Sequence, residues 1–185
     1  MKTVRQILAL AALTLPVAAL AQDGRLTMPD FSALAARSSE HTDISLGGGL
    51  LSFARHFVND NSSDAAAAGR FMAGLRSIEV HTYEFSSDNV YSASDIDSVR
   101  RQLQAPGWKR LVQTHSAADQ KDVDIYISLD GERPTGLAII AAEPREFTIV
   151  NLVGTIDLKD LATMDGQMGI PKHVVTVAEA KTAAD

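Results

Sequence analysis

The stretch "LAIIAAEPREFTIVNLVGTID", Leu137–Asp157, decides the fold, because it is strongly apolar and yet carries a charged segment at its centre. A single helix would hold Pro144 in its interior, at a cost of about 3 kcal/mol or more. A membrane span would bury the neighbouring charges, at about 2.5–3.5 kcal/mol for each. Two strands joined by a turn at Pro144-Arg145 avoid both costs. We therefore predict an antiparallel hairpin with strands over 136–143 and 146–156.

The same kind of pattern continues upstream. The segment "VDIYISLDG", residues 123–131, alternates apolar and polar side chains, which is typical of a strand with one buried face. Its Asp130-Gly131 pair is a hairpin-turn signal that leads into the strand over 136–143. Two runs rich in β-branched and aromatic residues, "SIEVHTYEF" (77–85) and "WKRLVQTHS" (108–116), predict further strands. We expect a mostly antiparallel sheet of about five strands.

Helical patterns lie before and between these strands. Asp30 can cap a short helix in "FSALAARSS", and the glycines Gly47–Gly49 precede an apolar helix. Asp64 can cap a third helix. In "SDIDSVRRQLQ" we expect Ser94 as the N-cap and Asp97 at the N3 position. This order of elements predicts an α+β fold, a two-layer sandwich with the helices packed on one face or at one end of the sheet.

Asn151 is a polar residue in a strand that should be mostly buried. A buried amide without partners costs about 1–3 kcal/mol. We therefore expect hydrogen-bond partners for Asn151 and a structural role.

The N-terminus has the features of a secretory signal. After a basic start, an uncharged apolar run from Ile7 to Ala21 ends in the small-x-small pattern Ala19-Leu20-Ala21. The run has 15 residues and contains Pro16, whereas a membrane-spanning helix needs about 20 apolar residues. We expect cleavage after Ala21, with an uncleaved anchor as the alternative. The predicted parts are a signal peptide (1–21), a flexible leader (22–29), one α+β domain (30–171), whose last helix Asp157 would cap, and a loose tail (172–185).

The amino-acid composition restricts the cell compartments and the classes of partner that fit this protein. The chain has no cysteine, which excludes disulfides, thiolate metal sites, a cysteine nucleophile and the lipidated cysteine of a lipoprotein. Its formal net charge is −6, and loss of Lys2 and Arg5 with the signal would make it −8. Such acidity, without a basic cluster, argues against nucleic acid and anionic lipid as partners. We expect a periplasmic protein without stable membrane insertion after signal cleavage.

The sequence contains no recognisable catalytic pattern. None of the five histidines has the spacing of a helical metal pair, and no serine lies in G-x-S-x-G. If the strands that carry His81 and His115 were neighbours, these two could bind a metal, or one could serve a hydrolase together with Asp124. We treat this as the least favoured alternative. We predict no catalytic, cofactor-binding or metal-binding residues, and no cofactor.

The apolar helix faces give the main functional indication. Three helices precede a sheet that can bury only a limited apolar area on one face, and surplus apolar surface would form an interface. The candidate interface residues are Phe53, Phe57, Phe71 and Met72. They favour a non-enzymatic binding or regulatory protein of the envelope, acting in signalling or maintenance, with an envelope protein or a second copy as partner. A small-ligand carrier, with a pocket between helices and sheet, is the alternative.

Four stretches together resemble one bacterial family: "MPDFSALAARSSE", "SIEVHTYEF", "YSASDIDSVRRQLQAPGWKRLVQ" and "GLAIIAAEPREFTIVNLVGTIDLKDLATMDGQMGIPK". They are similar to the family called domain of unknown function 4252 (DUF4252), from about Met28 to Lys172. The A-P-G-W-x-R and A-E-P-x-E…N-x-V-G-x-I-D elements are the most specific. The resemblance implies an exported protein, often a lipoprotein and often encoded near extracytoplasmic-function sigma factors and their anti-sigma partners. It implies no catalytic residues, and this chain departs from it in lacking the lipoprotein cysteine.

Overall fold

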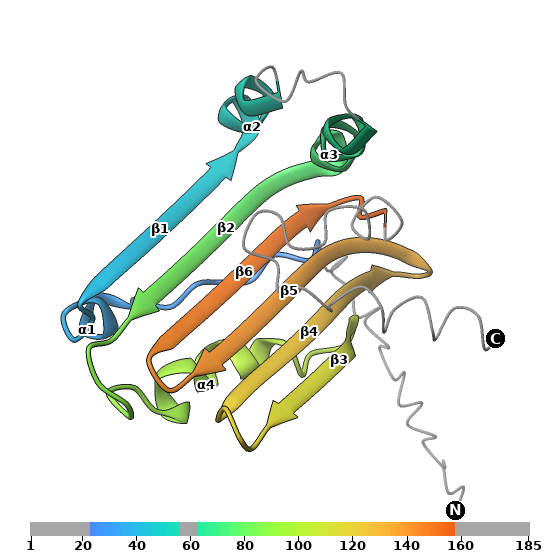
Figure 1. The fold of residues 1–185 in the computed structure, drawn as a ribbon. Coiled ribbons are helices and arrows are strands. Elements are labelled where there is room, and N and C mark those ends of the chain that lie inside the picture. Colours follow the sequence, from blue (N-terminus) through green and yellow to red (C-terminus); the bar gives the residue numbers. More distant parts are fainter. Residues whose placement is uncertain (1–22, 56–62, 158–185) are drawn as a thin grey trace, which may run out of the picture.

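The computed structural model describes residues 23–55 and 63–157. They form a six-stranded sheet in the order β1-β2-β6-β5-β4-β3, in which all neighbours are antiparallel (Figure 1). The strands are β1 (Glu40–Gly47), β2 (Leu75–Glu84), β3 (Trp108–Ser116), β4 (Lys121–Asp130), β5 (Arg133–Glu143) and β6 (Glu146–Gly154). The helices are α1 (Ser32–Ala35), α2 (Gly48–Arg55), α3 (Ser63–Gly74) and α4 (Ala93–Gln102). The α+β fold with an antiparallel sheet is thus confirmed.

The two predicted hairpins are present, so β4, β5 and β6 form a meander. β5 and β6 are joined by a turn at Pro144-Arg145, with Glu143 opposite Glu146. β4 and β5 are joined by a turn at Gly131-Glu132, where Gly131 has a φ of 63°. Because β5 and β6 lie in the middle of the sheet, both of their faces are covered, and this accounts for their nearly continuous apolar sequence.

One strand was missed by the sequence reasoning, so the sheet has six strands rather than about five. β1 pairs with β2 along its whole length, from Glu40 opposite Glu84 to Gly47 opposite Ser77. Seven of its eight residues are exposed, and only Leu46 is half-buried. A polar edge strand lacks the alternating apolar pattern by which strands are recognised, so its place in the sheet depends on pairing with β2.

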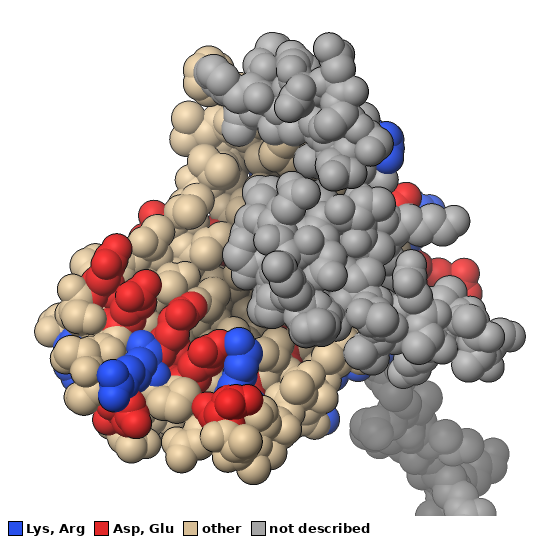
Figure 2. All heavy atoms as spheres, viewed as in Figure 1, with Lys and Arg blue, Asp and Glu red and all other residues tan. Residues whose placement is uncertain are grey.

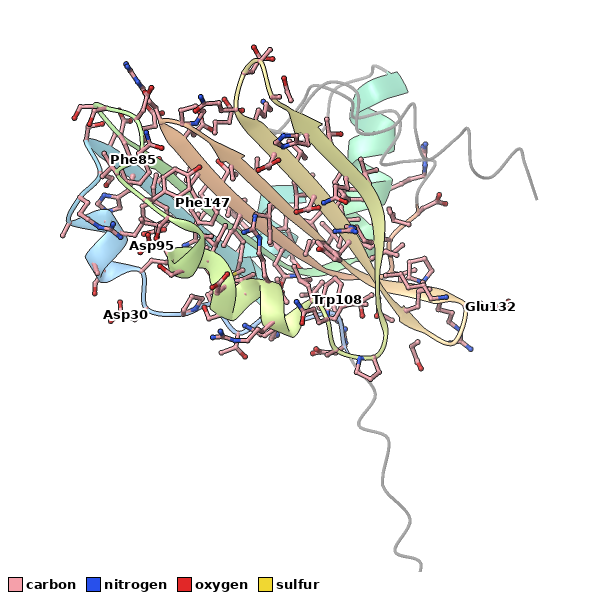
Figure 3. The ribbon with its side chains drawn as sticks, turned by 90° about the horizontal axis from the view of Figure 1, so that it is seen from below. Asp30, Phe85, Asp95, Trp108, Glu132 and Phe147 are labelled. Atoms are coloured by element: carbon pink, nitrogen blue, oxygen red, sulfur yellow. The ribbon has the colours of Figure 1, made fainter. Side chains whose placement is uncertain are left out.

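The two faces of the sheet carry separate hydrophobic clusters. On β5, Ile139 belongs to a cluster that includes Leu51 of α2 and Phe71 of α3, whereas Ile140 belongs to a cluster with Val99 of α4 and residues of α1. α1 and α4 cover one face, and α2 and α3 stand at one end of the sheet (Figure 1). Figure 3 shows the side chains of Phe85 and Phe147 on the face that α4 covers. Among the described residues, no helix is long and apolar enough to cross a membrane.

The start of α4 differs from the prediction by two residues. Ser92, not Ser94, is the N-cap, and Asp95, not Asp97, is at N3. The backbone N–H of Ser92 donates a hydrogen bond to Asp95 Oδ2 at 2.8 Å. Both pairs match the capping-box spacing, so the sequence alone could not separate them. Asp95 also binds Arg37 Nη2 at 2.6 Å, and this tertiary contact favours the earlier cap.

Residues 23–29, predicted to be a flexible leader, are instead held against the sheet. Leu26 is 2% exposed, and its N–H donates to Asn151 Oδ1 of β6 at 2.9 Å. Thr27 exchanges two hydrogen bonds of 2.8 Å with the side chain of Gln102 on α4. Asp30 accepts the N–H of Ser32 at 2.9 Å, so it does help to start α1, although Phe31 is the N-cap. The leader prediction was wrong because a local pattern does not reveal these long-range partners.

Several predictions lie outside the described residues. They concern the signal peptide (1–21), the last helix after Asp157 and the tail (172–185). α3 is present where a helix was expected, but the side chain of Asp64, its expected cap, is not among the described side chains.

Candidate functional site

The two histidines considered for a hydrolase or metal site are far apart. His81 lies on β2 and His115 on β3, with three strands between them. Four inter-strand steps of about 4.8 Å place the two strands about 19 Å apart. Asp124 lies opposite Gln113 in the sheet register, not opposite His115. The structure therefore does not bring together the residues of this alternative. The described residues contain no group of three or more His, Cys, Asp or Glu that could hold a metal ion.

Each of these histidines instead contacts an aspartate on the neighbouring strand. His81 Nδ1 lies 2.6 Å from Asp43 Oδ1, and His115 Nδ1 lies 2.6 Å from Asp122 Oδ1. Asp43 Oδ1 also accepts a hydrogen bond from the Tyr83 hydroxyl at 3.2 Å. Burial, followed by the charge of Asp43, raises the pKa of Tyr83. Because Asp43 is on β1 while both of its partners are on β2, this cluster joins the edge strand to the sheet.

The predicted interface residues have different positions. Phe53 on α2 is 63% exposed, as an interface residue would be. Phe71 and Met72 on α3 are buried, with 4% and 5% of their surface exposed. They belong to the core, so their assignment to an interface was wrong. Phe57 lies outside the described residues.

Two further apolar residues are exposed near Phe53. Leu50 on α2 is 62% exposed, and Ile44 on β1 is 40% exposed. β1 ends at Gly47 and α2 begins at Gly48, so the three residues are close in sequence and on elements in contact. We call Ile44, Leu50 and Phe53 the β1–α2 surface. The sequence reasoning identified Phe53, but missed Ile44, because β1 itself was missed.

The two edges of the sheet are protected to different degrees. β1 contains no Pro and no Lys, and its register with β2 is regular throughout. β3, the opposite edge, carries Lys109 and Arg110 and has a register shift between Arg110 and Val112. Charged side chains (lysine above all), prolines and bulges are devices by which proteins prevent the pairing of exposed edges. Of these, β1 has only the acidic side chains of Glu40 and Asp43. No strand of the described residues pairs with the outer edge of β1, so this edge is where a further strand could join the sheet.

A row of acidic side chains begins on the same edge strand. Glu40 of β1 lies opposite Glu84 of β2, Glu84 opposite Glu146 of β6, and Glu146 opposite Glu143 of β5. Lys121 of β4 forms an ion pair with Glu143 at the end of the row. Figure 2 shows acidic side chains gathered at this end of the face, with a few basic ones among them. Like charges directly opposite each other destabilise a sheet, so a cationic partner would relieve this row.

A polar pocket lies on the other face, between α4 and strands β3 and β4. Its volume is about 300 Å³. The lining includes Arg100 and Gln104 from α4 and Arg110, Gln113, Asp124 and Tyr126 from the strands. A smaller pocket of about 190 Å³ shares Arg100 and Asp122 with it and extends to Tyr91. The hydroxyl of Tyr91 donates to the carbonyl of Glu143 at 2.5 Å, and burial raises the pKa of Tyr91 to about 12.

The β1–α2 surface and the polar pocket both lie within a recognised protein family domain. The family model described as Domain of unknown function (DUF4252) matches residues 36–164. The chain belongs to the DUF4252 family. Comparisons with curated proteins and with solved structures give no significant match. The residues matched to DUF4252 include all six strands and the polar pocket, whereas the bound segment 23–29 and α1 precede the match. Both surfaces are therefore parts of the DUF4252 domain itself.

Proposed function

We propose that this protein is an exported, non-enzymatic binding protein that holds a partner protein by adding a strand of that partner to β1. The observation that carries the proposal is the exposed edge of β1, which has a regular register and contains neither Pro nor Lys. An edge strand presents a row of unpaired N–H and C=O groups, and an extended peptide binds it through main-chain hydrogen bonds. Export, predicted from the N-terminal signal pattern, sets the partner in the cell envelope, in signalling or maintenance.

The side chains around β1 set the chemistry of the partner. In strand addition, side-chain contacts give the specificity that the backbone bonds lack. Ile44 at the middle of β1, with Leu50 and Phe53 beyond one end, would contact apolar side chains of the added strand. Glu40 at the other end would contact lysine or arginine. The proposed partner is therefore an extended segment that is apolar along most of its length and basic near one end.

The histidine–aspartate contacts of the described residues have a structural explanation. The two histidine–aspartate contacts in the described residues lie on separate strands at opposite parts of the sheet. The Asp43 contact is used to join β1 to β2. A role for these residues in stability is sufficient to explain their positions.

The test is crosslinking in living cells, followed by affinity capture of the tagged full chain, with its N-terminal signal sequence retained, and mass spectrometry of the envelope fraction. Ile44→Lys places a charge on the edge strand, and Phe53→Asp places one on α2. Ala73→Asp, at an exposed position on α3, is the matched control. We expect one envelope protein to be captured by the wild type and by Ala73→Asp, and to be lost with the other two variants.

The captured segment should also bind as a synthetic peptide. A peptide from the partner that contains the apolar and basic residues should broaden or shift the backbone amide signals of residues 40–47 in an NMR titration. Capture that survives both substitutions, or a chain that remains a partnerless monomer in the envelope, would contradict the proposal. Light scattering separates the remaining case, in which the partner strand comes from a second copy.

A further inference from the structure

Asp124 is a buried carboxyl group with an incomplete set of partners. The residue is 9% exposed, and its Oδ1 has no hydrogen bond among the described residues. Its ion-pair partner is Arg110, whose Nη1 lies 3.7 Å from Oδ1, beyond hydrogen-bond distance. Burial raises the pKa of Asp124, although the charges of Arg110 and Arg100 act in the opposite direction. A buried, unsatisfied oxygen costs about 1–3 kcal/mol, and more when it is charged, so its retention calls for an explanation.

Asp124 also has a position that suggests a role in binding. It lines the polar pocket of about 300 Å³ between α4 and strands β3 and β4. Pockets for small molecules range from about 300 to 1,000 Å³, so this one has room for a small polar compound. Gln104 and Gln113 line the same space and provide further donors and acceptors. The carboxyl group of Asp124 would be a hydrogen-bond acceptor for a donor on a molecule bound there.

The charges around the pocket restrict the ligand further. Two guanidinium groups, Arg100 and Arg110, face two carboxyl groups, Asp122 and Asp124. A simple anion would be opposed by the carboxylates, and a simple cation by the arginines. An apolar molecule would make no hydrogen bond to any of these four charged groups while it shields them from water. A neutral molecule with separated positive and negative ends can satisfy both kinds of group at once.

We propose that the pocket between α4 and strands β3 and β4 binds a small zwitterion of the α-amino acid class. Its ammonium group donates to Asp124, and its carboxylate accepts from Arg110 and Arg100. This inference is independent of the strand-addition proposal, because the pocket and the exposed edge of β1 involve different residues on different strands. It also differs from a carrier of apolar compounds, since polar side chains dominate the lining.

The test uses the exported full chain, purified from the envelope and titrated with the twenty standard amino acids. Binding is followed by calorimetry and by NMR shifts of residues 100–126. For each amino acid that binds, the N-acetyl derivative removes the ammonium group, and the methyl ester removes the carboxylate. We expect both derivatives to bind at least about tenfold more weakly, the effect of losing about 1.4 kcal/mol.

Matched variants assign the contacts. Asp124→Asn and Arg110→Gln should each weaken binding at least about tenfold. Asp130→Asn on the same strand as Asp124, and Arg101→Gln next to Arg100 on α4, lie outside the lining and should leave binding unchanged. If Asp124→Asn does not fold, the N-acetyl derivative and Arg110→Gln still test the two contacts.

Two results would overturn the proposal. One is the absence of shifts at residues 100–126 with any amino acid at millimolar concentration. The other is binding that is as strong for an N-acetyl derivative or for Asp124→Asn as for the free amino acid and wild type, since this would assign the pocket to anions only.

Discussion

The side-chain oxygen of Asn151 accepts a hydrogen bond from the backbone N–H of Leu26 at 2.9 Å. The amide nitrogen of Asn151 donates to the carbonyls of Gly24 at 3.0 Å and Leu137 at 3.2 Å. One buried side chain on β6 thus joins the segment at residues 23–29 to the centre of the sheet. The expected partners of Asn151 are confirmed, and their identity shows how the N-terminal segment is held.

Replacing Asn151 should therefore destabilise the fold. Asn151→Ala leaves the buried N–H of Leu26 without an acceptor, and we expect the free energy of unfolding to fall by about 1–3 kcal/mol. Urea denaturation followed by circular dichroism measures this change. The control is Thr27→Ala, at the exposed residue next to Leu26, with an expected change in the free energy of unfolding within about 0.5 kcal/mol. Equal effects of the two substitutions would mean that the Asn151 hydrogen bonds contribute little.

The close approach of Gly24 to Gly136 leads to a second prediction. A Cβ atom on Gly24 would lie 2.6 Å from Gly136 Cα, and Gly24 has a φ of 75°. Gly24→Ala should therefore strain the backbone and also displace residues 23–29 from the sheet. Gly131, with a φ of 63°, has no atom within 4 Å of an added Cβ. We expect Gly131→Ala to cost about 1–2 kcal/mol, the cost of its backbone conformation, and Gly24→Ala to lower the thermal midpoint further.

Asp95 gives a prediction about pH. Burial opposes its charge, but the Ser92 backbone hydrogen bond and Arg37 outweigh burial, so the pKa of Asp95 lies below its ordinary value of 3.8. A carboxyl whose folded pKa is depressed stabilises the fold above its unfolded pKa, and this stabilisation is lost as the pH falls through the folded pKa.

Urea midpoints at pH 7 and pH 3 test this contribution. Asp95→Asn should lower the midpoint at pH 7 more than at pH 3, because the wild type is already losing the contribution at the lower pH. Asp97→Asn, exposed on the same helix, should show no such difference. A uniform loss at both pH values would contradict an electrostatic contribution of Asp95.

Asp124 should behave in the opposite way. Because the pKa of Asp124 is raised in the folded state, protonation of its carboxyl group favours folding. Ionisation of Asp124 therefore lowers the stability of the unliganded protein as the pH rises through the folded pKa. Asp124→Asn should therefore raise the thermal midpoint at pH 7, while it weakens the binding proposed above. Asp130→Asn should change neither. A lower midpoint for Asp124→Asn would show that the ionised carboxyl makes a net stabilising contribution within the fold.

Export gives a prediction that is independent of the described residues. Intact-mass analysis of the protein recovered from the envelope should show a chain that begins at Gln22, after cleavage behind Ala21. Ala19→Arg and Ala21→Arg together should block cleavage and leave the longer chain in the membrane fraction. A full-length chain in the wild type would favour the uncleaved anchor.

The sequence determined the parts of this protein whose local pattern and tertiary environment agree. The hairpins at Asp130-Gly131 and Pro144-Arg145, and the strand from Trp108 to Ser116, were predicted because alternating side chains and turn residues act over short distances. The lack of cysteine and the signal-like pattern of the N-terminus can likewise be interpreted without knowledge of the fold.

Only the tertiary structure decided which distant residues meet. β1 is a strand because its backbone pairs with β2, and residues 23–29 are ordered because Asn151 and Gln102 bind them from 75 residues or more away along the chain. The polar pocket has the same origin, since Arg100 and Asp124 become neighbours only when α4 packs across β3 and β4. Hydrogen bonds and charges between distant segments leave no periodic pattern in a sequence, and for that physical reason the edge strand β1 and the polar pocket could be located only from the fold.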